Sequence, residues 1–399
     1  MLTYARHSGL RRLAPLVLTV ALIGGSMTPV GATVGATVAG QLPPVPVEGL
    51  FTGSPPDVTA QTWILYDATF DRVLAEQEAD QRRAMASTTK MMTALLVVDN
   101  GSRFDRVTIS ETAPEVGEAE IDLVAGEVWT VDQLLNAMLL GSANDAALAV
   151  AEHVGGTVDG FVRLMNERAV QLGMNDTRFA NPHGLDEENH FSTARDLLTL
   201  AQAVMAVDEL AAIVAKREAS LPATIDGEER MVQTTNRLLF EYPGANGVKT
   251  GFTDDAGWTL AASAERDGRM LYAIVMGSAT VDRRFADAAA LLDYGFSEFG
   301  VVEVIVAGVD YARRRLPDDA DAEEAAATET VSFFANRDDA ELIVLTPAFD
   351  GEGAVVIASL GDEELARVPL ETTTESQLPE LTDAFAWASH YWDWLFGND

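Results

Sequence analysis

The sequence contains no cysteine, which removes several kinds of chemistry at once. Disulfide bonds, thiolate metal sites, cysteine nucleophiles and a lipid-modified N-terminal cysteine are all excluded. Basic residues are also scarce, since 27 Lys and Arg face 62 Asp and Glu, which gives a formal charge of −35 at pH 7. Such a surface repels phosphate backbones, so nucleic acid is not an expected partner. The acidic excess suggests a high-salt habitat, the alternative being an ordinary acidic soluble protein.

Lysine is the scarcest charged residue. Of the 27 basic residues only three are lysine, namely Lys90, Lys216 and Lys249. A buried lysine can lose its proton, whereas an arginine stays charged. Each lysine is therefore a candidate for a role that arginine cannot fill.

Disorder is excluded for most of the chain, because 48% of its 399 residues are hydrophobic and only 22% are charged. That length predicts two domains, or three. Residues 1–40 have the pattern of a signal peptide, with a basic start and an apolar stretch from Leu13 to Gly24. An uncleaved anchor is the alternative. The Pro-rich residues 41–56 are interpreted as a spacer.

Hydrophobic periodicity divides the remainder into two regions and a terminal segment. Residues 57–297 mix a helical cluster with antiparallel strands, which predicts an α+β domain. The expected strands are residues 62–66, 72–77, 248–252, 258–264 and 270–276. The expected helices are residues 91–100, 130–140, 145–154, 161–172 and 193–205.

Residues 298–377 are expected to form a small all-β domain, since short apolar runs recur without a convincing long helix. Between residues 301 and 380 there are 19 acidic and 5 basic residues. The expected strands are residues 301–307, 341–345, 354–359 and 366–370, and residues 318–329 are interpreted as an acidic loop.

The C-terminal segment, residues 378–399, is amphipathic and holds Trp387, Trp392 and Trp394. Aromatic residues are common where proteins meet the bilayer interface, so peripheral membrane contact through residues 380–399 is one interpretation. A helix docked on the protein is the other.

The first chemical signal is a serine and a lysine at a predicted helix start. Ser87 and Lys90 stand three residues apart, which places both side chains on one helix face. A serine hydroxyl becomes a good nucleophile when a base takes its proton, and a lysine with a lowered pKa can be that base. Taken alone, this spacing also arises by chance.

Two further signals follow in order. Ser142-Ala143-Asn144 precedes a predicted helix, where an N-cap loop is the alternative interpretation. Lys249, Thr250 and Gly251 lie on a predicted strand, whose alternative is a solvent-facing edge; glycine there would let a ligand approach the backbone. Together these signals resemble the Ser-x-x-Lys, Ser-Asp-Asn and Lys-Thr-Gly trio of class A β-lactamases and penicillin-binding proteins, except that the middle motif here is Ser-Ala-Asn.

The surrounding sequence is more specific. Phe179 to Asp186, Ser192 to Asp196, and Gly247 to Trp258 resemble low-molecular-weight penicillin-binding proteins that are serine D-alanyl-D-alanine carboxypeptidases (peptidase S11). The resemblance runs from about residue 56 to residue 296 and extends to the trailing β domain and amphipathic C-terminus. It implies a penicillin-binding, serine β-lactamase-like fold over residues 57–297.

The resemblance also implies catalytic roles. Ser87 would attack the carbonyl of the penultimate D-Ala of a peptidoglycan stem peptide, with Lys90 as general base. Ser142 would relay a proton to the departing D-Ala, and Asn144 would orient Lys90. β-Lactams would acylate Ser87 as covalent inhibitors.

The strand residues would bind substrate. Lys249 and Thr250 would hold the terminal carboxylate, and Gly251 would let the backbone of the substrate come close. The backbone N–H groups of Ser87 and Phe252 would form that hole. Phe252 departs from several relatives, which have His there, but only its backbone is needed. No cofactor is expected.

Four alternatives were weighed. A class A β-lactamase would need a Glu-x-x-Leu-Asn loop motif to activate water, which is absent here. A D,D-endopeptidase of cross-linked peptidoglycan would share every motif. A non-catalytic penicillin-binding module is disfavoured by the intact motifs. A zinc site from His183, His190 and Asp186 matches no usual ligand spacing.

Overall fold

The computed structural model describes residues 49–51, 53–221, 229–315, 322–349 and 353–374. The predicted signal peptide, the first part of the spacer and the C-terminal segment lie outside these residues, so those interpretations remain predictions. In the described part, no helix by itself has the length and apolar character to cross a bilayer. The helices α5 (Ala194–Met205) and α6 (Asp208–Val214) meet that criterion only as a pair bent by 106°.

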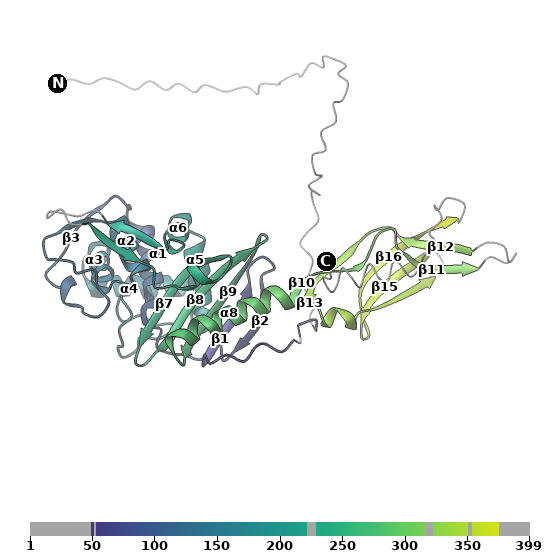
Figure 1. Ribbon diagram of the computed structural model, residues 1–399, viewed down its shortest axis with the longest axis horizontal. Coiled ribbons are helices and arrows are strands. Elements are labelled where there is room, and N and C mark those ends of the chain that lie inside the picture. Colours follow the sequence, from purple (N-terminus) through teal and green to yellow (C-terminus); the bar gives the residue numbers. More distant parts are fainter. Residues whose placement is uncertain (1–48, 52, 222–228, 316–321, 350–352, 375–399) are drawn as a thin grey trace, which may run out of the picture. The chain divides into compact units, whose positions relative to one another are not determined.

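A five-stranded antiparallel sheet with the order β2-β1-β9-β8-β7 forms the centre of the first region (Figure 1). Its strands are β1 (Thr62–Asp67), β2 (Arg72–Gln77), β7 (Ala245–Thr253), β8 (Gly257–Arg266) and β9 (Arg269–Ser278). All five predicted strands of this region are confirmed. The strand β7, which carries Lys249, lies at one end of the order.

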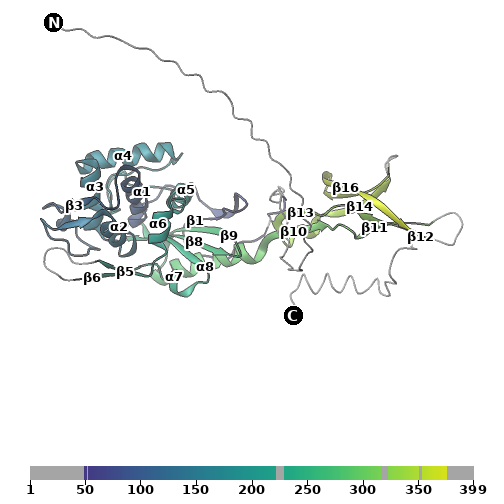
Figure 2. The same cartoon turned by 90° about the horizontal axis from the view of Figure 1, so that it is seen from above.

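The two faces of the sheet pack against different helices. Successive strand residues point to opposite faces, and accordingly Leu260 and Ala262 belong to one hydrophobic core while Ala261 belongs to another. The first core is completed by α8 (Val281–Glu298), the longest described helix, which was not predicted. The second is filled by the helical cluster on the other side of the sheet (Figures 1 and 2).

The helical cluster confirms the predicted helices. Besides α5 and α6 it contains α1 (Lys90–Asn100), α2 (Val131–Leu140), α3 (Asn144–Gly155) and α4 (Val158–Gln171). Thr130 and Gln133 form the predicted capping box of α2. Shorter elements were missed: the 3₁₀ turns η1 (Ala86–Thr89) and η2 (Ala113–Glu115), the helix α7 (Leu238–Glu241), and the hairpins β3 (Arg106–Thr108) with β4 (Val128–Thr130) and β5 (Glu218–Leu221) with β6 (Arg230–Gln233).

The trailing region is all β, as predicted. The strands β10 (Phe299–Ile305) and β13 (Val331–Asn336) form one antiparallel pair. A second sheet has the order β11-β12-β16-β15-β14. Its strands are β11 (Asp310–Arg315), β12 (Ala322–Ala327), β14 (Val344–Phe349), β15 (Ala354–Leu360) and β16 (Glu363–Thr374).

One prediction in this region is wrong, and another places the start of a strand too early. Residues 318–329 were expected to be a loop, but residues 322–327 form β12, because pairing with β11 and β16 overrides the weak strand propensity of its Ala and Glu residues. The strand expected at residues 341–345 exists but begins only at Val344, because a 3₁₀ turn, η3 (Asp339–Leu342), precedes β14.

The pair β10–β13 packs into the core of the first region. Phe299 and Phe334 are fully buried in the same hydrophobic core as α8. Phe334 stacks on Phe70 with ring centroids 3.9 Å apart, and Phe51 stacks on Phe299 at 5.8 Å. Leu50 is also buried. The described end of the predicted spacer is therefore part of the packed fold.

Candidate active site

Ser87 lies in the 3₁₀ turn η1, immediately before α1, whose first residue is Lys90. The Lys90 Nζ atom is 2.8 Å from the Ser87 Oγ atom, so the spacing of three residues brings both groups together as predicted. Ser87 is partly exposed, whereas Lys90 has an exposed fraction of 0%. The arrangement presents a hydroxyl to the solvent side and an amine beneath it.

The other partners of Lys90 are neutral oxygen atoms. Its Nζ atom lies 2.7 Å from Asn144 Oδ1 and 2.5 Å from the carbonyl oxygen of His183. Asn144 is the first residue of α3, and its Nδ2 donates to the carbonyl of Gly117, which leaves Oδ1 facing Lys90. Asn144 is therefore a direct partner of the lysine and not an N-cap, which corrects the alternative interpretation.

Burial lowers the pKa of Lys90 well below its ordinary value, and the nearby charge of Lys249 lowers it further. The carboxylate of Asp145 acts in the opposite direction. That carboxylate is itself fully buried and accepts hydrogen bonds from the backbone N–H groups of Ile121, Leu123 and Ala146. Within the described residues Lys90 forms no ion pair with a carboxylate, so a neutral amine is favoured.

Lys249 forms a second buried amine beside the first. Its Nζ atom donates to Ser142 Oγ at 3.0 Å and to the carbonyl of Thr250 at 2.9 Å. Burial, and then the charge of Arg284, lowers the pKa of Lys249 to about 7. The interpretation of Lys249 as part of a solvent-facing edge is thus wrong.

The strand β7 approaches the nucleophile closely at Gly251. A Cβ atom on this residue would lie 3.0 Å from Ala86 Cβ and 3.1 Å from the backbone nitrogen of Ser87, which is tighter than ordinary contacts. Thr250 Oγ1 is 2.6 Å from Thr235 Oγ1. The side chain of Phe252 is 42% exposed and stacks on Trp258.

Arg284 is a site residue that the sequence analysis missed. It extends from α8, donates from Nη1 to the carbonyl of Gly251 at 3.0 Å, and lies over the ring of Trp258. It is 6% exposed and forms no ion pair with a described carboxylate, and burial lowers its pKa to about 10. The available signal was the helical periodicity of residues 281–298 after the capping residue Thr280.

The predicted Asn-Pro-His-Gly turn packs against the nucleophile. The Asn181 side chain closes the turn by accepting from the N–H of Gly184 at 2.7 Å and donating to the carbonyl of Leu185 at 2.9 Å. Gly184 has a φ of +96°, and a Cβ there would lie 2.0 Å from the carbonyl oxygen of Ala86. No described group of three or more His, Asp or Glu side chains is arranged to hold a metal ion.

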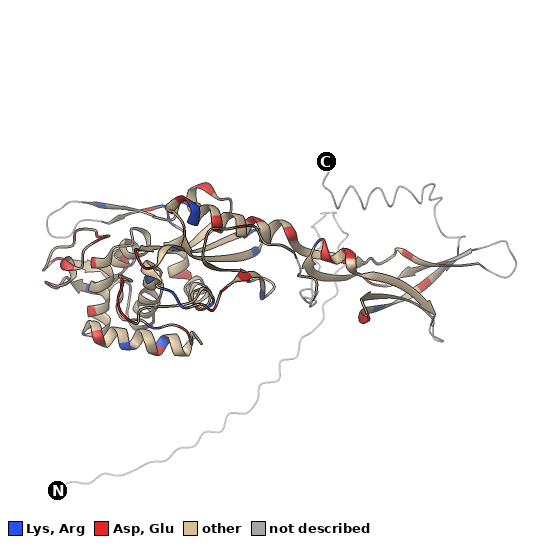
Figure 3. Cartoon of the chain, turned by 90° about the horizontal axis from the view of Figure 1, so that it is seen from below, with Lys and Arg blue, Asp and Glu red and all other residues tan. Residues whose placement is uncertain are grey.

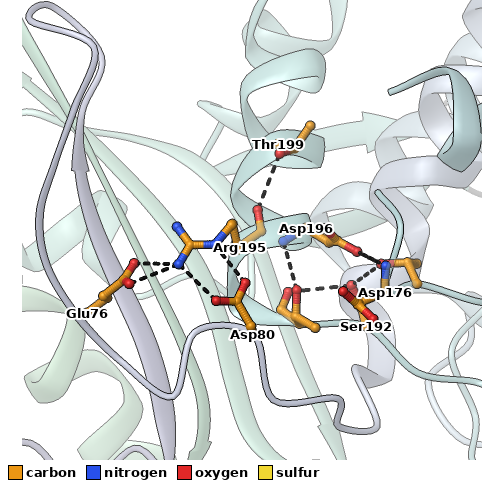
Figure 4. A network of polar contacts seen from close by, with 9 residues as sticks. Glu76, Asp80, Asp176, Ser192, Arg195, Asp196 and Thr199 are labelled. Carbon is orange, nitrogen blue, oxygen red and sulfur yellow. Dashed lines mark hydrogen bonds and ion pairs between the residues drawn. The ribbon is translucent and has the colours of Figure 1, made fainter. Parts of the chain in front are cut away.

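The motif from Ser192 to Asp196 supports the segment that leads to Ser87. Arg195 forms ion pairs with Glu76 and Asp80 at 2.8 and 2.7 Å (Figure 4). Hydrogen bonding to Arg195 lowers the pKa of Asp80. Ser192 and Arg83 exchange two backbone hydrogen bonds. The motif therefore fixes the approach of the chain to η1.

Comparisons with known proteins agree with this geometry. A family model described as D-alanyl-D-alanine carboxypeptidase (peptidase S11) matches residues 50–280. The chain is 36% identical to D-alanyl-D-alanine carboxypeptidase DacF of Bacillus subtilis, over 60% of this chain and 63% of DacF. It is also 36% identical to DacA of Escherichia coli K12, over 64% of this chain and 66% of DacA. The match thus spans just under two thirds of each of these relatives.

Solved structures are similar as well. The D-alanyl-D-alanine carboxypeptidase DacD of Francisella tularensis aligns with a TM-score of 0.64 and 25% identity, covering 81% of this chain and 95% of that one. The Streptomyces K15 DD-transpeptidase aligns with a TM-score of 0.59 and 31% identity, covering 61% of this chain and all of that one. The family match includes every site residue predicted from the sequence, and the chain belongs to the peptidase S11 family of D-alanyl-D-alanine carboxypeptidases.

Proposed function

We propose that this chain is a serine D-alanyl-D-alanine carboxypeptidase, which removes the terminal D-Ala from peptidoglycan pentapeptide stems through an acyl-enzyme at Ser87. The observation that carries the proposal is the buried amine of Lys90, which lies 2.8 Å from Ser87 Oγ with only neutral partners. An amine with a lowered pKa beside a hydroxyl is the arrangement that activates a serine nucleophile.

In the proposed acylation, neutral Lys90 takes the Ser87 proton as Oγ attacks the carbonyl of the penultimate D-Ala. Negative charge then develops on the carbonyl oxygen, which the backbone N–H groups of Ser87 and Phe252 stabilise. The peptide C–N bond breaks as Ser142 relays the proton held by Lys90 to the leaving nitrogen, which leaves Lys90 neutral again. Water then attacks the acyl-enzyme ester and gives a proton to Lys90, which returns it to Ser87 Oγ as the ester bond breaks and the shortened stem departs.

In the proposed complex, the terminal carboxylate of the substrate lies beside Lys249 and Thr250. Burial lowers the pKa of Lys249 to about 7, and a bound carboxylate would favour its charged form. Arg284, which contacts Gly251 of the same strand, adds positive charge without a carboxylate partner among the described residues. These groups support the choice of a substrate that ends in a free carboxylate.

The similarity to the Streptomyces K15 DD-transpeptidase supports a second candidate. A transpeptidase would form the same acyl-enzyme and transfer it to an amine instead of water. A D,D-endopeptidase would cleave a cross-link with the same groups. A β-lactamase is less well supported, because the carboxylates nearest the Asn-Pro-His-Gly turn are engaged: Asp186 accepts from Thr253 and Glu187 accepts from Asn181.

The test offers three substrates to one protein. D-Ala release from a pentapeptide is expected to exceed cleavage of purified cross-linked muropeptide and transfer to an added amino acid. Benzylpenicillin should add one adduct to the protein by intact-mass spectrometry, and Ser87→Ala should carry none. An adduct on Ser87→Ala contradicts the nucleophile, and faster transfer than hydrolysis contradicts the carboxypeptidase assignment.

Place of action is proposed from the sequence. The predicted signal peptide supports export to the cell wall or to the outer face of the cytoplasmic membrane. Aromatic residues between 387 and 396 support weak membrane contact. A liposome flotation assay should show binding that disappears when residues 380–399 are deleted. Equal flotation of both forms would remove the proposed contact.

A further inference from the structure

His190 is a buried, titratable side chain that the proposed reaction does not use. It is 5% exposed, and both of its ring nitrogens have partners. The backbone N–H of Ala180 donates to Nδ1 at 2.9 Å, and Nε2 lies 2.7 Å from Thr89 Oγ1. Because an amide N–H can only donate, Nδ1 carries no proton, so the neutral ring has its proton on Nε2 and donates it to Thr89.

The two partners of this ring belong to two separate segments that both reach Lys90. Thr89 is the last residue of η1 and directly precedes Lys90, the first residue of α1. Ala180 leads into the turn whose His183 carbonyl lies 2.5 Å from Lys90 Nζ. One imidazole therefore connects the backbone that carries the amine to the segment that supplies one of its oxygen partners.

That connection matters because of the geometry of a neutral amine. The amine has two N–H groups and one lone pair. Asn144 Oδ1 and the His183 carbonyl can accept the two N–H groups, which leaves the lone pair directed at the Ser87 hydroxyl. If the His183 carbonyl shifted, the lone pair would turn away from Ser87, and misplacements of about 1 Å can cost up to ~100-fold in rate.

We propose that His190 is a positioning residue for the general base: it holds Thr89 and the segment from Ala180 to His183 together so that the lone pair of Lys90 faces Ser87. The proposal rests on the role of Lys90 in the proposed function.

The surroundings of His190 keep its ring neutral, which the hydrogen bonds to Ala180 and Thr89 require. Burial lowers the pKa of His190 to about 4, the charge of Lys90 acts in the same direction, and the carboxylate of Asp186 opposes them. Thr93 also holds the turn, since its hydroxyl donates to the carbonyl of Pro182 at 2.6 Å. The loss of His190 should therefore weaken acylation without abolishing it.

The test compares substitutions in the full chain. His190→Gln keeps an acceptor and a donor on one planar amide, whereas His190→Leu removes both. Thr89→Val cuts the connection at its other end, and His153→Leu on the exposed side of α3 is the control. Acylation by benzylpenicillin, followed by intact mass over a concentration series, separates the acylation rate constant from the dissociation constant of the initial complex.

We expect His190→Leu and Thr89→Val each to lower the acylation rate constant about tenfold, with the dissociation constant unchanged within about threefold. His190→Gln and His153→Leu should stay within about threefold of wild type. The double variant His190→Leu/Thr89→Val should lose little more than either single variant, because both cut one connection. Melting temperatures establish that each variant is folded under assay conditions.

Three outcomes would overturn the proposal: acylation of folded His190→Leu within threefold of wild type, an equal loss in His190→Gln, or a loss confined to the dissociation constant. If His190→Leu does not fold, the acylation rate constants of Thr89→Val and His190→Gln are compared instead, and the same criteria apply. Failure of the proposed function is a separate result, because it is wild-type protein that then releases no D-Ala from the pentapeptide.

Discussion

The surroundings of the site and the sheet β11-β12-β16-β15-β14 place their cations differently. Lys90 and Lys249 are buried and form no ion pairs with described carboxylates. In the trailing sheet Arg313 and Arg367 lie near the surface and pair with Glu324 and Glu364. Exposed pairs of this kind contribute little to stability, whereas a buried unpaired amine is costly.

This difference in burial and pairing of the basic side chains indicates a different role for them in each region. An amine that is buried without an ion pair costs stability when it is charged, and its benefit lies in a lowered pKa. Charges that face solvent support solubility, and each of them individually changes stability little. The following experiments test this contrast, beginning with the largest expected effect.

Lys90→Arg should reduce acylation by benzylpenicillin by about 10²- to 10⁴-fold, because arginine keeps the cation and cannot serve as a base. Stopped reactions analysed by intact mass give the rate. Arg367→Ala in the trailing sheet is the control and should leave the rate unchanged. Near-wild-type acylation by folded Lys90→Arg protein would contradict the base role.

Phe334→Ala should lower the free energy of unfolding by about 3–5 kcal/mol, since this ring is fully buried against Phe70. Val356→Ala, a buried change in the core of the trailing sheet, should cost roughly 2 kcal/mol and leave penicillin acylation intact. Urea unfolding followed by fluorescence measures both. Equal, small effects would mean that β13 does not share the core of the first region.

Acid should destabilise the site region through its buried histidines. Burial lowers the pKa of His190 to about 4, against an ordinary value of 6.5. Between these values the unfolded chain binds a proton and the folded chain does not, so this stability is lost as pH falls from about 6.5 to about 4. His190→Gln should therefore lose about 2 kcal/mol less than wild type between pH 7 and pH 5. Urea unfolding of both proteins at pH 7 and pH 5 measures these losses, and an equal loss in wild type and His190→Gln would contradict the prediction.

Salt should have the smallest effect and should act on the whole surface. Acidic residues are distributed over the helices of the first region and over the trailing strands (Figure 3), and the formal charge is −35. Screening of this self-repulsion should raise the melting temperature by a few degrees between about 0.05 and 2 M KCl, because the Debye length falls to a few Å. A flat profile would remove the high-salt interpretation and leave the catalytic proposal standing.

The sequence predicted the site better than the trailing region. Strongly periodic segments such as residues 193–205 and the sheet strands were identifiable because burial on one face leaves a pattern. The strand β12 was not, because its Ala-Glu sequence carries no such pattern and its conformation depends on distant partners. Tertiary pairing of that kind is invisible to local propensity.

Within the site, motif residues were found and supporting residues were missed. Ser87 and Lys90 are marked by their spacing of three residues, and Lys249 is marked by the Lys-Thr-Gly motif. Arg284 and His190 act through contacts between segments far apart in the chain, so no spacing marks them. The sequence alone suggests His190 only as a possible metal ligand, whereas in the structure its two ring nitrogens form hydrogen bonds with Ala180 and Thr89.

The packing around η1 limits which amino-acid substitutions this protein can tolerate there. Gly184 and Gly251 both lie close to the backbone of Ala86 and Ser87. A single added carbon at Gly184 would overlap the carbonyl oxygen of Ala86. Ala86 itself has a φ of +49°, which few residues tolerate. A saturation library across these three positions should consequently return almost nothing but glycine at 184 and 251, and alanine or glycine at 86. Under the proposed acylation of Ser87 by β-lactams, variants that escape these inhibitors are therefore expected to carry their substitutions outside these three positions.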